Sequence, residues 1–162
     1  MEKIRAIFDC MIFLQAAINE KSPAAELFRQ VEKGTILLFI SKEILLEIRD
    51  VLSRPKVRDK NPHLTDNYVK LFIGGVLQKA IRIKTIPPRF NYSRDPKDEK
   101  YINPAIEAEA DYIVSRDKDL LDLISDISVT GKEFRQKSRP LKIVEPIEFL
   151  QILADEKLSL KP

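Results

Sequence analysis

The chain has 162 residues, of which 44% are hydrophobic and 33% charged, so it can bury the core of one domain and lacks the composition of a disordered protein. Lys and Arg outnumber Asp and Glu by 28 to 25, and the resulting net charge of +3 permits a polyanionic partner without requiring one. No run approaches the roughly 20 apolar residues of a membrane span, so we expect no membrane association.

The first predicted element is a buried strand at residues 4–8, which is followed by a helix. Lys3 and Arg5 precede an apolar stretch, as in a signal peptide, but Asp9 interrupts that stretch and no small-residue cleavage site follows. The single Cys10 cannot form an internal disulfide, which favours a reducing compartment. We therefore expect a cytoplasmic protein.

The next elements are bounded by capping residues. Ser22 and Pro23 begin a helix that ends near Gly34, and Ser41 caps the helix that follows a strand at residues 36–40. The remaining expected elements are a basic polar segment at 53–62, a helix at 65–79, an edge or half-exposed strand at 81–86, a helix opened by Asp95 and Pro96, a strand at 111–115, a short helix at 119–124, a strand at 141–144 and a terminal helix from Glu145 and Pro146.

Strands that are almost continuously apolar alternate with helices along the whole sequence. This alternation is typical of a parallel sheet covered by helices on both faces. We find no internal repeat, low-complexity tract or linker. The sequence therefore predicts a single domain over residues 1–162, with a three-layer α/β/α fold around a central, mainly parallel sheet of four or five strands.

Two acidic residues follow predicted strands directly. Asp9 follows the first strand, and Asp117 follows the strand that ends at Ser115. In open parallel sheets the working site lies beyond the carboxyl ends of the strands, so both acids belong at one edge. For either acid alone, a loop residue that begins a helix or a turn is the simpler interpretation.

Two further acids occupy helical positions near the same edge. Glu47 borders the apolar stripe of its helix, three residues after Ile44 and four before Val51, although its carboxylate can also reach solvent from there. Asp98 lies four residues before Ile102 on the inward stripe of its helix. It also fits a capping acid in the first helical turn, and the two interpretations are compatible.

Four carboxylates at one edge repel one another unless a cation joins them. Oxygen ligands without His or Cys suit Mg²⁺ or Mn²⁺, which can activate water and stabilise the leaving oxygen in phosphodiester hydrolysis. An Asp-x-Asp phosphatase motif is excluded because Met11 replaces its second acid, and with four glycines a phosphate-binding loop is absent. The sequence therefore predicts metal-assisted phosphodiester cleavage by Asp9, Glu47, Asp98 and Asp117.

Four segments resemble, in order, the motifs of the PIN-domain family, particularly the branch of toxin components from prokaryotic toxin–antitoxin systems. They are residues 7–10, residues 40–47 with 51–54, residues 95–101, and residues 110–121. The resemblance covers nearly the whole chain. It implies that Asp9, Glu47, Asp98 and Asp117 hold Mg²⁺ or Mn²⁺, with Asp119 as an accessory acid and Ser115 as a supporting hydroxyl.

The same resemblance implies partners and an activity. RNA would be the substrate, the protein would form a homo-oligomer (a dimer or tetramer), and an antitoxin protein would block the site. Two positions depart from the pattern, because Met11 replaces an asparagine that helps to organise the site and Pro104 interrupts a helix. The alternative is therefore a catalytically weakened PIN-like module that binds RNA or a protein partner.

Basic residues gather in two places that could contact an RNA backbone. The first cluster contains Arg54, Lys56, Arg58 and Lys60, and the second contains Lys132, Arg135, Lys137, Arg139 and Lys142. Solvated charges on surface loops explain each cluster equally well.

Overall fold

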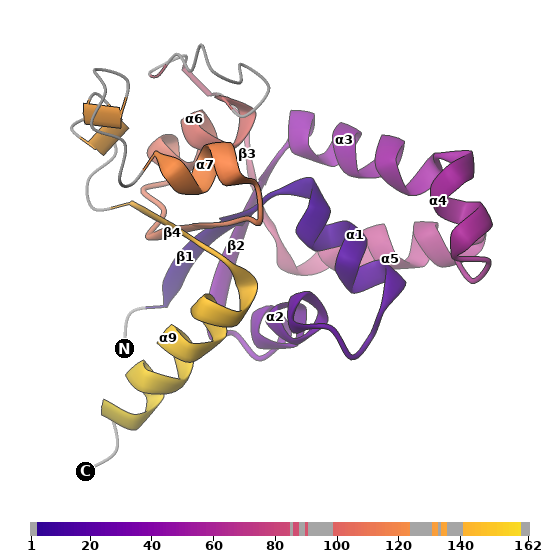
Figure 1. Cartoon of the computed structure of the whole chain (residues 1–162), viewed down its shortest axis with the longest axis horizontal. Helices are drawn as coiled ribbons and strands as arrows, with labels where there is room; N and C mark the ends of the chain where they lie inside the picture. Colours follow the sequence, from indigo (N-terminus) through magenta and orange to yellow (C-terminus); the bar gives the residue numbers. More distant parts are fainter. Residues whose placement is uncertain are drawn as a thin grey trace.

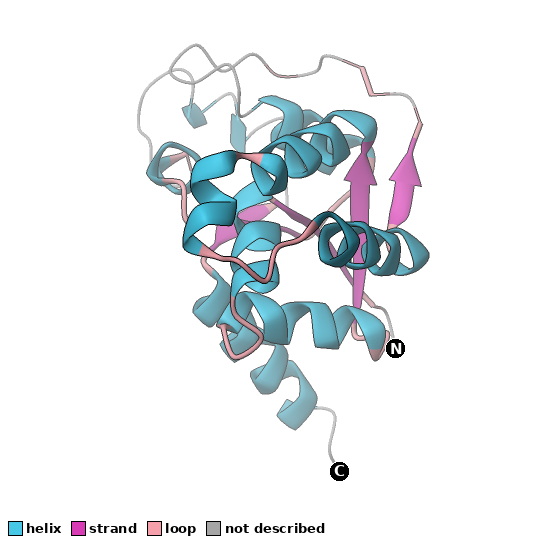
Figure 2. Ribbon diagram, turned by 90° about the vertical axis from the view of Figure 1, so that its right-hand side faces the viewer, coloured by secondary structure: helices cyan, strands magenta, loops and turns pink. Residues whose placement is uncertain are grey.

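The computed structural model describes residues 3–84, 86–87, 90, 99–123, 131–132, 134–135 and 141–159. Within these residues, five strands form one sheet (Figures 1 and 2). They are β1 (Ile4–Phe8), β2 (Ile36–Ser41), β3 (Ile81–Ile83), β4 (Tyr112–Val114) and β5 (Lys142–Val144). The spatial order is β3-β2-β1-β4-β5 and all neighbours are parallel, which confirms the predicted α/β fold.

Helices flank this sheet (Figure 2). They are α1 (Cys10–Ile18), α2 (Pro23–Glu32), α3 (Lys42–Ser53), α4 (Pro55–Lys60), α5 (Asp66–Lys79), α6 (Glu99–Glu107), α7 (Lys118–Asp122) and α9 (Pro146–Ser159). The predicted caps are present: the Ser22 side chain accepts from Ala25 N at 3.1 Å, and that of Ser41 from Ile44 N at 3.2 Å. No helix in the described part of the chain is long and apolar enough to cross a membrane.

Two local features differ from a simple interpretation of the sequence. The basic segment expected to interrupt the helices contains α4, which begins at Pro55 because the fixed φ of proline suits the first helical position. Pro104 is buried inside α6, and the helix nevertheless continues to Glu107. Because proline has no N–H, one i→i−4 hydrogen bond is lost there without ending the helix.

In the sheet, β1 has β2 on one side and β4 on the other. The order of the strands therefore reverses between β1 and β4. Ligands of open α/β sheets bind outside the carboxyl ends of the strands at such a point. Asp9 N donates to the Val114 carbonyl at 3.1 Å, which joins the end of β1 to the end of β4. The fold thus places the residues after β1 and β4 side by side.

Candidate active site

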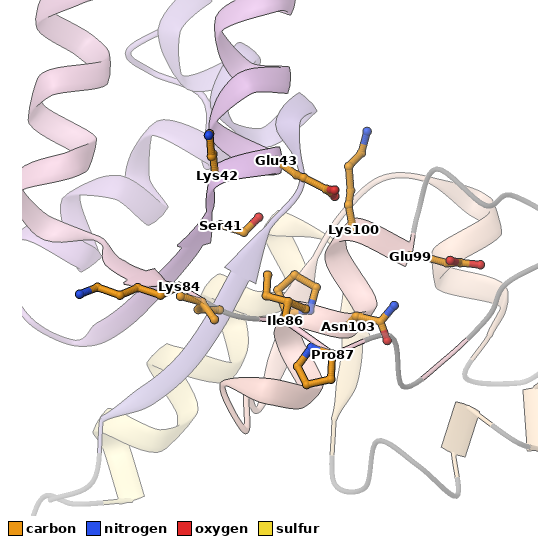
Figure 3. Close-up of a pocket in the computed structure, with 11 residues that line it drawn as sticks. Ser41, Lys42, Glu43, Lys84, Ile86, Pro87, Glu99, Lys100 and Asn103 are labelled. Carbon is orange, nitrogen blue, oxygen red and sulfur yellow. The ribbon is translucent and has the colours of Figure 1, made fainter.

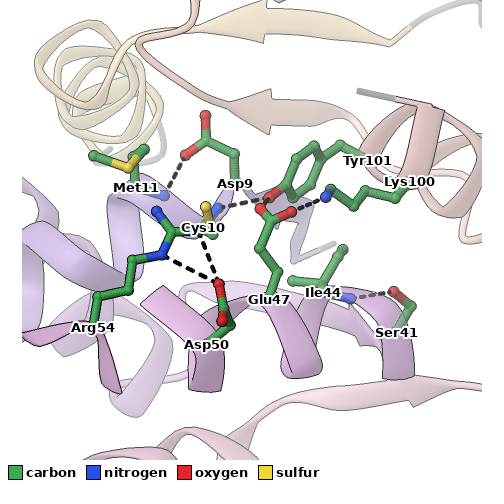
Figure 4. Close-up of polar contacts among 10 residues, drawn as sticks. All are labelled: Asp9, Cys10, Met11, Ser41, Ile44, Glu47, Asp50, Arg54, Lys100 and Tyr101. Carbon is green, nitrogen blue, oxygen red and sulfur yellow. Dashed lines mark hydrogen bonds and ion pairs between the residues drawn. The ribbon is translucent and has the colours of Figure 1, made fainter. Parts of the chain in front are cut away.

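Asp9 is the residue that links the fold to the site. It caps α1, and its Oδ1 accepts hydrogen bonds from Met11 N at 3.0 Å and Ile12 N at 3.2 Å. Its Oδ2 accepts a hydrogen bond from the hydroxyl of Ser115, and only 4% of the residue is exposed. Local capping thus orients the carboxylate, and burial removes it from water (Figure 4).

Ser115 connects two of the predicted acids. While its hydroxyl donates to Asp9, its Oγ accepts a hydrogen bond from Asp117 N at 2.9 Å. Asp117 caps α7, and its Oδ1 accepts from Asp119 N at 2.8 Å. Asp117 and Asp119 are both partly exposed. The structure therefore brings the carboxylate of Asp9 and the backbone N–H of Asp117 to one buried hydroxyl.

The electrostatics of Asp9 follow from this geometry. Burial raises the pKa of Asp9 from 3.8 to about 6, hydrogen bonds from Ser115, Ile12 and Met11 oppose that rise, and the negative charge of Asp117 adds to it. Near neutral pH the site therefore holds a buried carboxylate beside a second one. A bound cation would offset both the lost hydration and the repulsion.

Glu47 approaches the site from α3 and is held by two residues of α6. The Tyr101 hydroxyl donates to Glu47 Oε1, and the Lys100 ammonium forms an ion pair with Glu47 Oε2. The same Tyr101 hydroxyl accepts from Cys10 N at 3.1 Å, next to Asp9 (Figure 4). Tyr101 is only 3% exposed, and burial raises the pKa of its hydroxyl, so it remains a donor.

Lys100 and Tyr101 are site residues that the sequence analysis does not predict. The sequence does contain a signal for Tyr101, because it follows Asp98 by three residues, a spacing that would place both on one face of the helix expected there. Nothing local identifies Lys100, whose partner Glu47 is far away in the sequence. Asp98 lies outside the described residues.

The donor chemistry of the site fits a hard divalent cation. Asp9, Asp117 and Glu47 offer carboxylate oxygens, the ligands that Mg²⁺ and Mn²⁺ prefer. The single His63 lies elsewhere, with Nε2 at 3.0 Å from the Ala17 carbonyl, and burial raises the pKa of the Cys10 thiol, which keeps it a poor ligand. Among the described residues, no three His, Cys, Asp or Glu side chains are already arranged to hold a metal ion.

Met11 lies in the first turn of α1, beside Asp9 (Figure 4). Its side chain is 45% exposed, and its backbone N–H rather than its thioether contacts the carboxylate. The amide that an asparagine would offer at this position is therefore missing from the rim of the site.

The predicted basic residues are in varied surroundings. Arg54 forms an ion pair with Asp50 at 2.8 Å, Arg58 forms one with Asp66, and Arg135 donates to the Leu123 carbonyl at 3.1 Å. The exposed members are Arg54, Lys56, Lys60, Lys132 and Lys142. Lys137 and Arg139 lie outside the described residues.

A cavity of about 600 Å³ is lined in part by Lys100, the ion-pair partner of Glu47 (Figure 3). Its walls come from the start of α3, the end of β3 and α6. Lys100 belongs both to this cavity and to the ion pair with Glu47. Lys100 therefore links the cavity to the acidic site.

The sheet is all-parallel, and carboxylates lie where the order of its strands reverses. These features define an α/β protein with an acidic site at the carboxyl ends of its strands. A family model described as PIN domain matches residues 5–119, and the chain belongs to the PIN-domain family. The matched segment contains Asp9, Glu47, Asp98 and Asp117. Membership suggests a nuclease-like function on RNA, and the family typically uses divalent metal ions. The resemblance found in the sequence is thereby confirmed for the family.

The chain is also similar to a protein of Methanocaldococcus jannaschii named "Uncharacterized protein MJ1680". The two are 29% identical over 149 residues, which cover 92% of this chain and 91% of the relative. Because 92% of this chain is covered, the similarity extends beyond the segment matched by the family model. It therefore includes β5 or part of the helix that follows β5.

Proposed function

We propose that this protein, as a single cytoplasmic domain over residues 1–162, is a Mg²⁺- or Mn²⁺-dependent endoribonuclease that hydrolyses RNA phosphodiesters. The observation that carries the proposal is the buried carboxylate of Asp9, which the Ser115 hydroxyl links to the backbone of Asp117. Burial raises the pKa of this carboxyl and the negative charge of Asp117 adds to the rise, so the ionised site is costly without a cation. Catalysis offers a reason to keep these acids.

Asp9 and Asp117 would hold the metal together with Asp98 and Glu47, with Asp119 as an accessory acid. When bound, the ion would activate water and stabilise the leaving oxygen. Ser115 keeps Asp9 and the backbone of Asp117 in place through hydrogen bonds. The Tyr101 hydroxyl donates to Glu47 and accepts from Cys10 N, which keeps Glu47 next to Asp9. For Glu47 to become a ligand, Lys100 must leave Oε2, and its ammonium is then available to a phosphate of the substrate.

The test is RNA cleavage by the purified protein in Mn²⁺ and in EDTA. We expect single-stranded RNA to be cleaved only with metal. Cleavage should be lost in Asp9→Asn, Asp98→Asn and Asp117→Asn. The control Asp59→Asn, at an exposed position of α4, should cleave as well as the parent protein. Mn²⁺ should also raise the melting temperature of the parent protein, since it binds the native state. Cleavage that survives Asp117→Asn would overturn the proposal.

We further propose that the enzyme is the toxin of a toxin–antitoxin pair, acts as a dimer or tetramer, and is inhibited by its antitoxin protein. Support comes from the resemblance of its four motifs to that branch of the family. Expression of the parent protein should arrest growth of the host, whereas Asp117→Asn should not. Arrest by both proteins would show that toxicity is unrelated to the acidic site.

The second candidate is a catalytically weakened PIN-like module that binds RNA or a protein. Two observations favour it: the Lys100 ion pair engages Glu47, and Met11 presents no amide to the site. RNA binding by the parent protein without cleavage at any Mn²⁺ concentration would favour this candidate over the enzyme.

A further inference from the structure

Four cations surround a second cavity, of about 460 Å³, between α3 and β3. They are Lys42, Arg49, Arg82 and Lys84, all exposed, and the other lining side chains are aliphatic. Within the described part of the chain, none of the four has an ion pair or a side-chain hydrogen bond. No carboxylate lines this cavity, so its positive charge is not neutralised locally.

The fold explains why these cations converge. Ser41 of β2 lies opposite Ile83 of β3 in the parallel register, so Lys42 and Lys84 leave neighbouring strands at the same edge. Arg49 follows Lys42 by seven residues on α3, which returns it to the same helical face. This is the edge of the sheet at which the acids lie.

The second cavity continues into the first. Both are lined by Lys42, Ile83 and Lys84, and the first cavity extends to Lys100, the ion-pair partner of Glu47 (Figure 3). We call this continuous surface, from Lys100 to Arg49 and Arg82, the α3–β3 groove. It begins at the candidate active site and ends at cations that have no partner among the described residues.

We propose that the α3–β3 groove binds the phosphate backbone of single-stranded RNA and leads it to the acidic site. The inference rests on the proposed function and adds the path of the substrate. Unneutralised cations attract phosphates and release counterions on binding. The aliphatic side chains between the cations offer no donors or acceptors that would select a base.

The groove is a better candidate than the basic cluster on α4. Arg54 and Arg58 form ion pairs with Asp50 and Asp66, so a phosphate would have to compete with a carboxylate for each of them. Lys42, Arg49, Arg82 and Lys84 form no ion pair within the described part of the chain, and the carboxylates that line the groove, Glu43 and Glu99, belong to its first cavity. Two exposed lysines of α5, Lys70 and Lys79, lie outside both cavities of the groove and both basic clusters, so they provide a matched control.

The test measures binding rather than cleavage. The probe is a short fluorescein-labelled single-stranded oligoribonucleotide, followed by anisotropy in EDTA over a range of salt concentrations. Lys42→Gln with Lys84→Gln should weaken binding about tenfold and lower the salt slope of log Kd by about 1.4, the value for two lost phosphate contacts on a single strand. Arg49→Gln with Arg82→Gln should act similarly, whereas Lys70→Gln with Lys79→Gln should change neither quantity.

The outcomes separate this inference from the proposed function. If the parent protein binds or cleaves RNA and the Lys42/Lys84 double variant performs equally well, the groove is wrong and the nuclease stands. Equally tight binding of duplex RNA or of poly-glutamate would also overturn the assignment to a single RNA strand. If the parent protein neither binds nor cleaves RNA, both proposals fail. All six substituted side chains are exposed, so circular dichroism should show unchanged folding.

Discussion

The ammonium of Lys100 on α6 is paired with the carboxylate of Glu47 on α3 at the mouth of the acidic site. The two side chains are 22% and 20% exposed, so solvent screens the pair only in part. Lys100 Nζ also lies 5.8 Å from the centre of the Tyr101 ring. A protein cation thus engages an acid that we propose as a metal ligand.

Lys100→Met should raise the affinity for Mn²⁺ about tenfold, because the metal no longer has to displace the ammonium from Glu47. Isothermal titration without RNA measures this directly and avoids the second role of Lys100 in the groove. Lys70→Met, at an exposed position on α5, is the control for the loss of one positive charge. An unchanged affinity in Lys100→Met would mean that Glu47 does not bind the metal.

Tyr101→Phe should destabilise the protein by about 1–3 kcal/mol, since Cys10 N loses its acceptor and Glu47 loses a donor in a largely buried place. Urea unfolding in EDTA gives the free energy of unfolding. Tyr112→Phe is the control, because no hydrogen bond is recorded for that partly exposed hydroxyl within the described residues. Equal stability changes in the two variants would contradict a specific role for the Tyr101 hydroxyl.

The raised pKa of Asp9 predicts how stability depends on pH without metal. The folded protein keeps the Asp9 proton up to about pH 6, whereas the unfolded chain loses it above pH 3.8, so this residue's contribution to stability falls as pH rises through that interval. Asp9→Asn keeps a capping oxygen and removes the charge. In EDTA near neutral pH it should therefore be more stable, on the order of 1–3 kcal/mol.

Melting curves of Asp9→Asn and the parent protein across the acid range provide the check. The difference in melting temperature should shrink towards pH 3.8, where the parent carboxyl is also largely neutral. A variant less stable than the parent protein near neutral pH would show that the charge of Asp9 is well compensated in the folded protein.

Met11→Asn should increase Mn²⁺-dependent RNA cleavage, because it returns a hydrogen-bonding amide to the rim of the site beside Asp9. The initial rate of cleavage is the measurement, and Met11→Leu, which changes shape but offers no polar group, is the control. If Met11→Asn is no more active than the parent protein, Met11 does not limit the site.

Much of the fold could be predicted because its signals are local. Apolar runs such as residues 4–8 and caps such as Ser22 and Ser41 act over a few neighbouring residues, so they can be recognised in the sequence alone. The alternation of strands and helices then limits the fold to a parallel sheet. The placement of Asp9 and Asp117 at one edge follows from that sheet alone.

The contacts within the site were decided by the tertiary structure. Ser115 and Asp9 are 106 residues apart, and their hydrogen bond depends on β4 lying next to β1. Tyr101 reaches Cys10 across 91 residues. Likewise, the sequence shows the basic run around Arg54, but only the folded chain shows which cations are neutralised and which line a groove. Helix and strand formation depend on near neighbours, whereas side-chain pairing depends on which distant segments the packed core brings together.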